Sequence, residues 1–158
     1  MAQTITFHQK LKLTFPEGFR EMSQAERGNL TMIAEGPGSC LTDPERHIIV
    51  SVGWRPLGRW TSLILSAKDA AKHMEGSIRK AMAPYGCRVT RAPGKRIGGE
   101  KAEGVCFDYT VQEIGMHGES YVVKRDRVFY YLHVYVREEA KGESLNLWEE
   151  ILSTAKWI

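Results

Sequence analysis

The segment 102–138 constrains the fold of this chain more than any other. Apolar side chains occupy every second position near both of its ends: Val105, Phe107, Tyr109 and Val111, then Val128, Tyr130, Leu132, Val134 and Val136. Such alternation is the period of a β-strand with one buried face. Glycines at 115 and 118 and a charged run at 124–127 indicate two turns between the rows. The segment therefore predicts three antiparallel strands, at 102–112, 120–124 and 128–137.

Helical patterns occur at three other places. After Ser66 and Asp69, which suit a helix start, apolar residues recur every three or four positions and predict the longest helix, at 68–83. Pro84 and Gly86 end that pattern. Ser23 and Glu26 form a capping box for a short helix that ends near Gly28. A terminal helix is predicted after Ser144, with one apolar side: Leu145, Trp148, Ile151, Leu152 and Ala155.

Further strands are predicted before the longest helix. The alternation at 5–15 predicts one long strand or two short ones, and 30–34 with 48–54 predicts a hairpin whose long tip is the Gly/Pro-containing segment 36–46. The apolar segment 60–65 fits neither pattern clearly. Runs of strands with helices placed between and after them favour an α+β fold in a single domain, 1–158. We expect an antiparallel sheet of about six strands flanked by helices, an α/β/α sandwich.

Composition excludes several classes of protein. The hydrophobic fraction of 42% and charged fraction of 26% are those of an ordinary globular protein and exclude a disordered or fibrous chain. The net charge of +3 is too small to indicate a dedicated nucleic-acid binder. The N-terminal residues do not form an export signal, and the sequence contains no membrane-spanning apolar run. We therefore expect a cytoplasmic protein.

The cysteines and histidines give little support for a catalytic or metal site. Cys40, Cys87 and Cys106 have no C-x-x-C spacing, so neither a disulfide framework nor a zinc knuckle is indicated. Five histidines fall in five different predicted elements: His8, His47, His73, His117 and His133. No His-x-x-x-His pair occurs, so no metal or other cofactor is expected. Cys40 is the best candidate nucleophile, because Asp43, Glu45, Arg46 and His47 follow it in the same predicted loop, but without an identified base a passive thiol is favoured.

A basic segment at 88–104 contains Arg88, Arg91, Lys95, Arg96 and Lys101. It matches neither the phosphate-binding P-loop nor the dinucleotide fingerprint, and aromatic residues are not interleaved with its cations. A solvated connection is therefore favoured over an anion site, and nucleic-acid binding is not expected.

Aromatic residues on both sides of the last strand are the remaining feature. Phe129, Tyr131, His133 and Tyr135 alternate with the apolar row at 128–136. Either helices cover both faces of the sheet, which is favoured, or the second row belongs to a binding surface. The residues predicted for that surface are Trp54, Trp60, Tyr121, Phe129, Tyr131, His133 and Tyr135.

Four segments together resemble the PsbP-like superfamily, which includes the Mog-type Ran-binding import factor, DcrB-type bacterial proteins and chaperones of type VI secretion effectors. They are LKLTFPEGF (11–19), the helix at 68–83, IGGEKAEGVCFDYTV (97–111) and a closing helix WEEILSTAKWI (148–158). The resemblance implies a non-enzymatic protein that binds other macromolecules.

The function predicted from these observations is a non-catalytic cytoplasmic adaptor or chaperone-like module that recognises a protein partner through a sheet face or rim. An unpaired edge strand or exposed aromatic row would also allow a homodimer. Two alternatives stay open. A small enzyme would use Cys40 or His133 in a polar pocket, and a small-ligand or lipid carrier would show an apolar cavity between sheet and helix.

Overall fold

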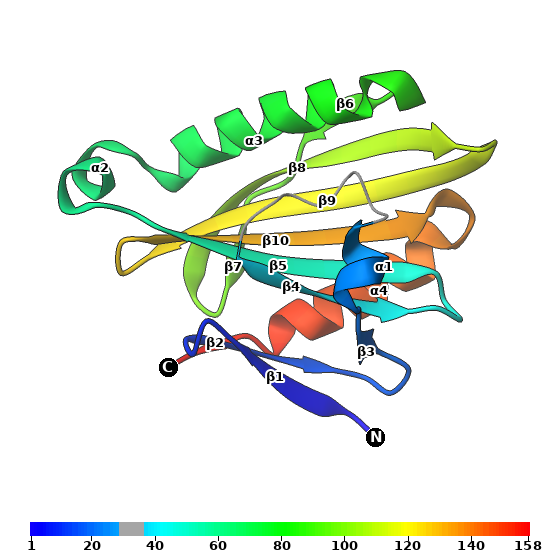
Figure 1. Cartoon of the computed structure of the whole chain (residues 1–158), viewed down its shortest axis with the longest axis horizontal. Coiled ribbons are helices and arrows are strands. Elements are labelled where there is room, and N and C mark those ends of the chain that lie inside the picture. The colour runs from blue at the N-terminus through cyan, green and yellow to red at the C-terminus, as the bar shows by residue number, and fades with distance from the viewer. Residues whose placement is uncertain (29–36) are drawn as a thin grey trace.

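The computed structural model describes residues 1–28 and 37–158, and the strand predicted at 30–34 lies outside them. Figure 1 shows the elements in space. The helices are α1 (Gln24–Gly28), α2 (Arg59–Ile64), α3 (Ala67–Met82) and α4 (Lys141–Ser153), with 3₁₀ turns at Ala83–Tyr85 and Glu138–Ala140. The strands are β1 (Gln3–Phe7), β2 (Leu11–Phe15), β3 (Arg20–Glu21), β4 (Gly38–Asp43), β5 (Ile48–Pro56), β6 (Arg88–Arg91), β7 (Lys95–Ile97), β8 (Glu100–Val111), β9 (Ile114–Arg125), β10 (Val128–Arg137) and β11 (Lys156–Trp157).

A large antiparallel sheet organises the molecule, as the sequence predicts. Within the described residues it has eight strands in the order β3-β4-β5-β10-β9-β8-β6, with β7 also paired to β8. The expected number of about six was too low. Two of the additional strands, β6 and β7, lie in the basic segment predicted to be a connection, and β4 occupies part of the predicted hairpin tip. Tertiary pairing with longer neighbours stabilises these short strands despite their turn-rich composition.

The meander of β8, β9 and β10 is confirmed, but its middle strand is longer than predicted. Gly115 and Gly118 lie inside β9, and the turn falls instead at Gln112 and Glu113, whose φ angles are 49° and 68°. Gly118 is needed for packing: a Cβ there would come within 2.3 Å of the Phe107 ring. Gly118 therefore marks close packing within a strand and not the end of one.

The N-terminal strand is two short strands joined at His8 and Gln9, which have φ angles of 52° and 55°. This hairpin and β11 form a separate three-stranded sheet in the order β1-β2-β11. The predicted closing helix is therefore too long, since α4 ends at Ser153 and the chain then enters β11. Ser144 does not cap α4, because the helix begins earlier, at Lys141, and buries Ser144.

Helices cover the large sheet on both faces, as Figure 1 shows, with α3 on one side and α4 on the other. The predicted start of α3 is confirmed, because Ser66 and Asp69 form a reciprocal capping box. The helix α4 packs between β10 and β2, so the small sheet closes the layer on its side. Each face has its own apolar core, one under α3 and one around α4. Among the described helices, none has both the length and the apolar character needed to cross a bilayer.

Candidate binding surface

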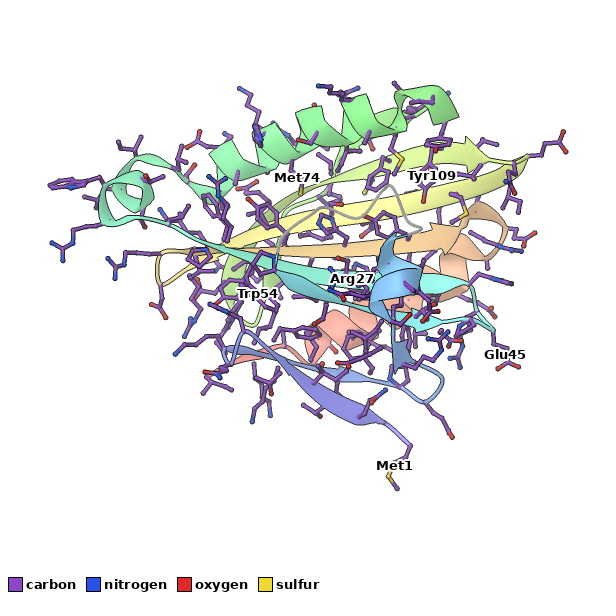
Figure 2. The ribbon with its side chains drawn as sticks, viewed as in Figure 1. Met1, Arg27, Glu45, Trp54, Met74 and Tyr109 are labelled. Atoms are coloured by element: carbon purple, nitrogen blue, oxygen red, sulfur yellow. The ribbon has the colours of Figure 1, made fainter. Side chains whose placement is uncertain are left out.

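An apolar groove lies between α3 and the β4, β5 and β10 part of the large sheet. Its volume is about 420 Å³, within the usual range of ligand pockets. Ala70 and Met74 of α3 form part of one wall, and Tyr131 and His133 of β10 form part of the other. Figure 2 shows Met74 beneath α3 and Trp54 lower in the view, toward the β1–β2 hairpin. The lining is mostly apolar.

Local sequence explains why this part of the sheet has room for a groove. The helix α3 packs over β8 and β9, where its small apolar side adjoins the core. At the groove, Gly38 of β4 faces Gly53 of β5, and Gly53 faces Tyr131 of β10. A Cβ on Gly38 would come within 2.8 Å of the Val52 carbonyl oxygen, whereas a Cβ on Gly53 would meet only the Pro37 carbonyl oxygen, at 3.4 Å. Gly53 thus leaves space that a larger side chain would fill, whereas Gly38 allows β4 and β5 to approach closely.

Three of the seven predicted binding residues border the groove: Trp54, Tyr131 and His133. The Trp54 side chain, however, lies on the opposite face of the sheet, where it stacks on His8 and packs against the core around α4. Phe129 and Tyr135 are on the same strand but are buried in the core beneath α3. Tyr121 belongs to the core on the opposite face. Trp60 is on α2 and is 75% exposed. The structure therefore divides the predicted set among a groove, two cores and a short helix.

His133 is a buried, neutral side chain of the groove wall. Its Nδ1 shares a hydrogen bond of 2.6 Å with the Ser120 hydroxyl, and its ring stacks with those of Tyr131 and Tyr135. Burial lowers the pKa of His133 to about 4, because the charged imidazolium would lose its hydration. Other titratable or charged residues lining the groove are Arg27, Arg55 and His73.

The helix α2 exposes its apolar residues instead of burying them. Trp60, Leu63 and Ile64 are 75%, 76% and 78% exposed, and Ser62 is the buried residue of this helix. Positions i, i+3 and i+4 lie on one side of a helix, so these three side chains form one apolar stripe toward solvent. Of these three residues, only Trp60 belongs to the predicted binding set, although the i, i+3, i+4 spacing is visible in the sequence. We call Trp60, Leu63 and Ile64 the α2 stripe.

Lys124 of β9 holds α2 in place. Its ammonium donates hydrogen bonds to the carbonyl oxygens of Ser62 and Leu65, the latter at 2.6 Å. Carbonyls at a helix C-terminus lack partners within the helix, and a cation there also favours the helix dipole. This contact fixes a helix that is too short to be stable by itself.

The candidate nucleophile Cys40 and the cations of the basic segment 88–104 lie in other parts of the structure. Cys40 is 1% exposed on β4, not in a loop, and its predicted neighbour Asp43 is engaged by Arg46. In the basic segment, Lys95 pairs with Glu149 and Lys101 lies 3.4 Å from Glu103. The backbone places Arg88 and Arg91 on β6, at one edge of the large sheet. These cations are therefore spread over several elements.

Comparison with solved structures identifies the architecture. The cyanobacterial PsbP of Synechocystis matches with a TM-score of 0.71 at 12% identity, covering 99% of this chain and 92% of that one. LpqN of Mycobacterium tuberculosis, described as involved in cell envelope biogenesis, gives 0.62 at 10% identity over 99% and 90% of the chains. The Ran-binding protein Mog1p of Saccharomyces cerevisiae gives 0.60 at 7% identity over 98% and 94%.

Sequence comparison gives no corresponding assignment: no protein-family model and no curated protein sequence matches the chain. At identities this low, the structural likeness establishes the fold and not the activity. The resemblance found in the four sequence segments is confirmed at that level. This chain has the PsbP-like fold that the Mog1p structure shares.

Proposed function

We propose that the protein is a non-catalytic binding module whose groove holds an apolar segment of a protein partner. The groove carries this proposal, because its lining is mostly apolar and includes Tyr131, whose side chain is of a type that anchors protein interfaces. The lining also includes three exposed polar residues, Arg55, His73 and Ser77. An apolar centre with polar surroundings is the usual composition of a protein interface.

The α2 stripe favours a protein partner over a small ligand. The helix connects the end of β5 to the start of α3, the two elements that wall the groove. A ligand inside the groove would leave Trp60, Leu63 and Ile64 in water, whereas a protein segment can cover the groove and the stripe together. A cytoplasmic adaptor or chaperone-like role would use this surface for an apolar segment that needs protection from water. The shared fold with a protein described as Ran-binding agrees with such a role.

Site-specific photo-crosslinking tests the proposal. A photoreactive amino acid replaces Ser77, an exposed α3 residue that lines the groove, and the chain is expressed in its native cells. Gly53→Phe then fills the groove, because Gly53 has space above its Cα. The matched control is Thr110→Phe, which adds the same ring at an exposed strand position outside the groove. We expect a discrete protein adduct whose yield falls about tenfold with Gly53→Phe, as a loss of about 1.4 kcal/mol in binding requires. Thr110→Phe should leave it unchanged.

Three results would contradict the proposal. The adduct could be a lipid or metabolite, which would instead establish the carrier alternative that the groove volume also allows. The protein adduct could persist at full yield with Gly53→Phe, which would remove the groove from the interface. No adduct with any macromolecule would remove the binding function at this surface.

A further inference from the structure

A polar cluster lies on the face of the large sheet opposite α3. It consists of Cys106 and Asp108 on β8 and His117, Glu119 and Tyr121 on β9. In the β8–β9 ladder, Cys106 is opposite Glu119 and Asp108 is opposite His117. Residues opposite one another, and residues two positions apart on one strand, share a face of the sheet. The register therefore gathers five chemically active side chains that are up to 15 positions apart in the sequence.

One ring nitrogen of His117 is satisfied and the other is not. Nδ1 lies 2.7 Å from Asp108 Oδ1. Nε2 is buried and has no hydrogen-bond partner within the described part of the chain, and the side chain is only 7% exposed. The carboxylate oxygen Glu119 Oε2 is 3.7 Å from Nε2, beyond hydrogen-bond distance. A buried polar atom without a partner is costly, so this nitrogen points to a missing ligand.

The atoms around Nε2 are suitable metal ligands. Cys106 Sγ, His117 Nε2 and a Glu119 carboxylate oxygen all lie within 4.8 Å of one another. Tetrahedral zinc, with bonds of about 2.0–2.3 Å, keeps its ligand atoms about 3.3–3.6 Å apart. The Nε2–Oε2 separation of 3.7 Å is close to that spacing. Small side-chain rotations would therefore complete the site.

Two neighbours orient the ligands in the way that metal sites require. Asp108 engages the His117 nitrogen that faces away from the cluster. The Tyr121 hydroxyl donates to Glu119 Oε1, at 3.0 Å, and leaves Oε2 toward His117. A carboxylate on the second nitrogen of a ligating histidine, and a hydrogen bond to a ligating carboxylate, are regular features of such sites.

We propose that Cys106, His117 and Glu119 bind a Zn²⁺ ion, with a water molecule as the fourth ligand. Sulfur, imidazole nitrogen and carboxylate oxygen together suit zinc better than Mg²⁺ or Ca²⁺, which prefer oxygen ligands alone. A thiolate and a carboxylate also balance the charge of the ion. No metal is expected from the sequence, because it contains no His-x-x-x-His pair, whereas the pairing of two strands creates this set. The site is independent of the proposed binding function.

A protonated His117 held between two carboxylates is the competing explanation. Although burial opposes the charged form, the neighbouring Cys106, Glu119 and Asp108 side chains raise the pKa of His117 to about 10 in the metal-free chain. Zinc would then displace this proton on binding, as metals generally do with protonated ligands.

Metal titration of the full chain, after treatment with a chelator, distinguishes the two. We expect one Zn²⁺ per chain, and Co²⁺ in its place should give a thiolate charge-transfer band with the visible bands of a tetrahedral ion. Cys106→Ser should abolish the band. The matched control is Cys87→Ser, since Cys87 is also a partly buried thiol but packs against the core on the α3 face. That variant should keep the band and the stoichiometry.

A second measurement uses the unaltered chain and so does not depend on a variant that folds. Zn²⁺ should slow alkylation of Cys106 by about tenfold or more and leave the rate at Cys87 unchanged, because a metal-bound thiolate is less available. Absence of the cobalt–thiolate band, its persistence in Cys106→Ser, or equal alkylation of Cys106 with and without zinc would each overturn the site. The cluster would then be a buried ion-paired histidine.

Discussion

Among single residues, His133 shows how the fold changes the chemistry of a side chain. Its ring lies between Tyr131 and Tyr135, and its Nδ1 is hydrogen-bonded to Ser120. In the unfolded chain the imidazole has its ordinary pKa of 6.5, and burial lowers this pKa to about 4 in the folded protein. The alternating pattern of β10 placed His133 in a row that is either buried or part of a binding surface. It did not predict whether the imidazole is charged.

The lowered pKa of His133 predicts that acid destabilises the protein. Between pH 6.5 and 4 the unfolded chain takes up a proton at this residue and the folded chain does not, so stability falls as the pH falls. The loss assigned to His133 should reach about 2–3 kcal/mol near the lower end of that range.

Urea unfolding as a function of pH, compared between the wild type and His133→Gln, measures this effect. The variant cannot be protonated there, so the difference between the two curves should shrink toward low pH. Parallel curves would show that His133 takes up its proton at the same pH in the folded and unfolded chains, so that burial does not lower its pKa.

Among the elements, α2 is held in place by Lys124 from another part of the chain. The segment 60–65 gave no clear pattern, because its apolar residues face water and its six-residue helix has too few turns for a periodic signal. The helix α3 was predictable, since its capping box and apolar side are local properties. The strands β4 and β6 were missed, because pairing with β5 and β8 decides their conformation.

The anchoring of α2 by Lys124 leads to a stability prediction. Lys124→Met keeps the length of the side chain but removes the donor for the Ser62 and Leu65 carbonyls. We expect a loss of about 2 kcal/mol in the free energy of unfolding, typical of hydrogen bonds to a charged group, and faster proteolysis within 57–66. Lys101→Met is the control, because the Lys101 side chain is 74% exposed. Equal urea midpoints for the two variants would mean that Lys124 does not hold α2.

At the scale of the whole molecule, Trp157 connects the small sheet to the large one. Its ring meets Tyr130 of β10 edge to face at 4.9 Å between centroids, and its Nε1 donates to the Ile97 carbonyl oxygen of β7 at 3.2 Å. Arg125 lies over the same ring, 5.2 Å from its centroid. One side chain of the small sheet thus contacts three strands of the large one.

Trp157→Ala should therefore destabilise the protein by about 2–3 kcal/mol, less than for a fully buried tryptophan because Trp157 is only partly buried. Guanidinium unfolding followed by circular dichroism measures the change. The neighbouring Ile158→Ala should have little effect, since Ile158 is 59% exposed. A comparable loss in both variants would indicate a general effect of the terminal strand and not of the tryptophan contacts.

By itself, the sequence determined the antiparallel meander, the long helix and the α+β class, because alternation and helical spacing are properties of neighbouring residues. It also narrowed the candidate binding residues to a set that includes Tyr131 and His133 of the groove. Only the tertiary structure decided which aromatic residues are core, that the α2 stripe faces water, and that Cys106, His117 and Glu119 meet. The reason is physical: strand register and helix placement join residues distant in the chain, and no local pattern encodes those distances.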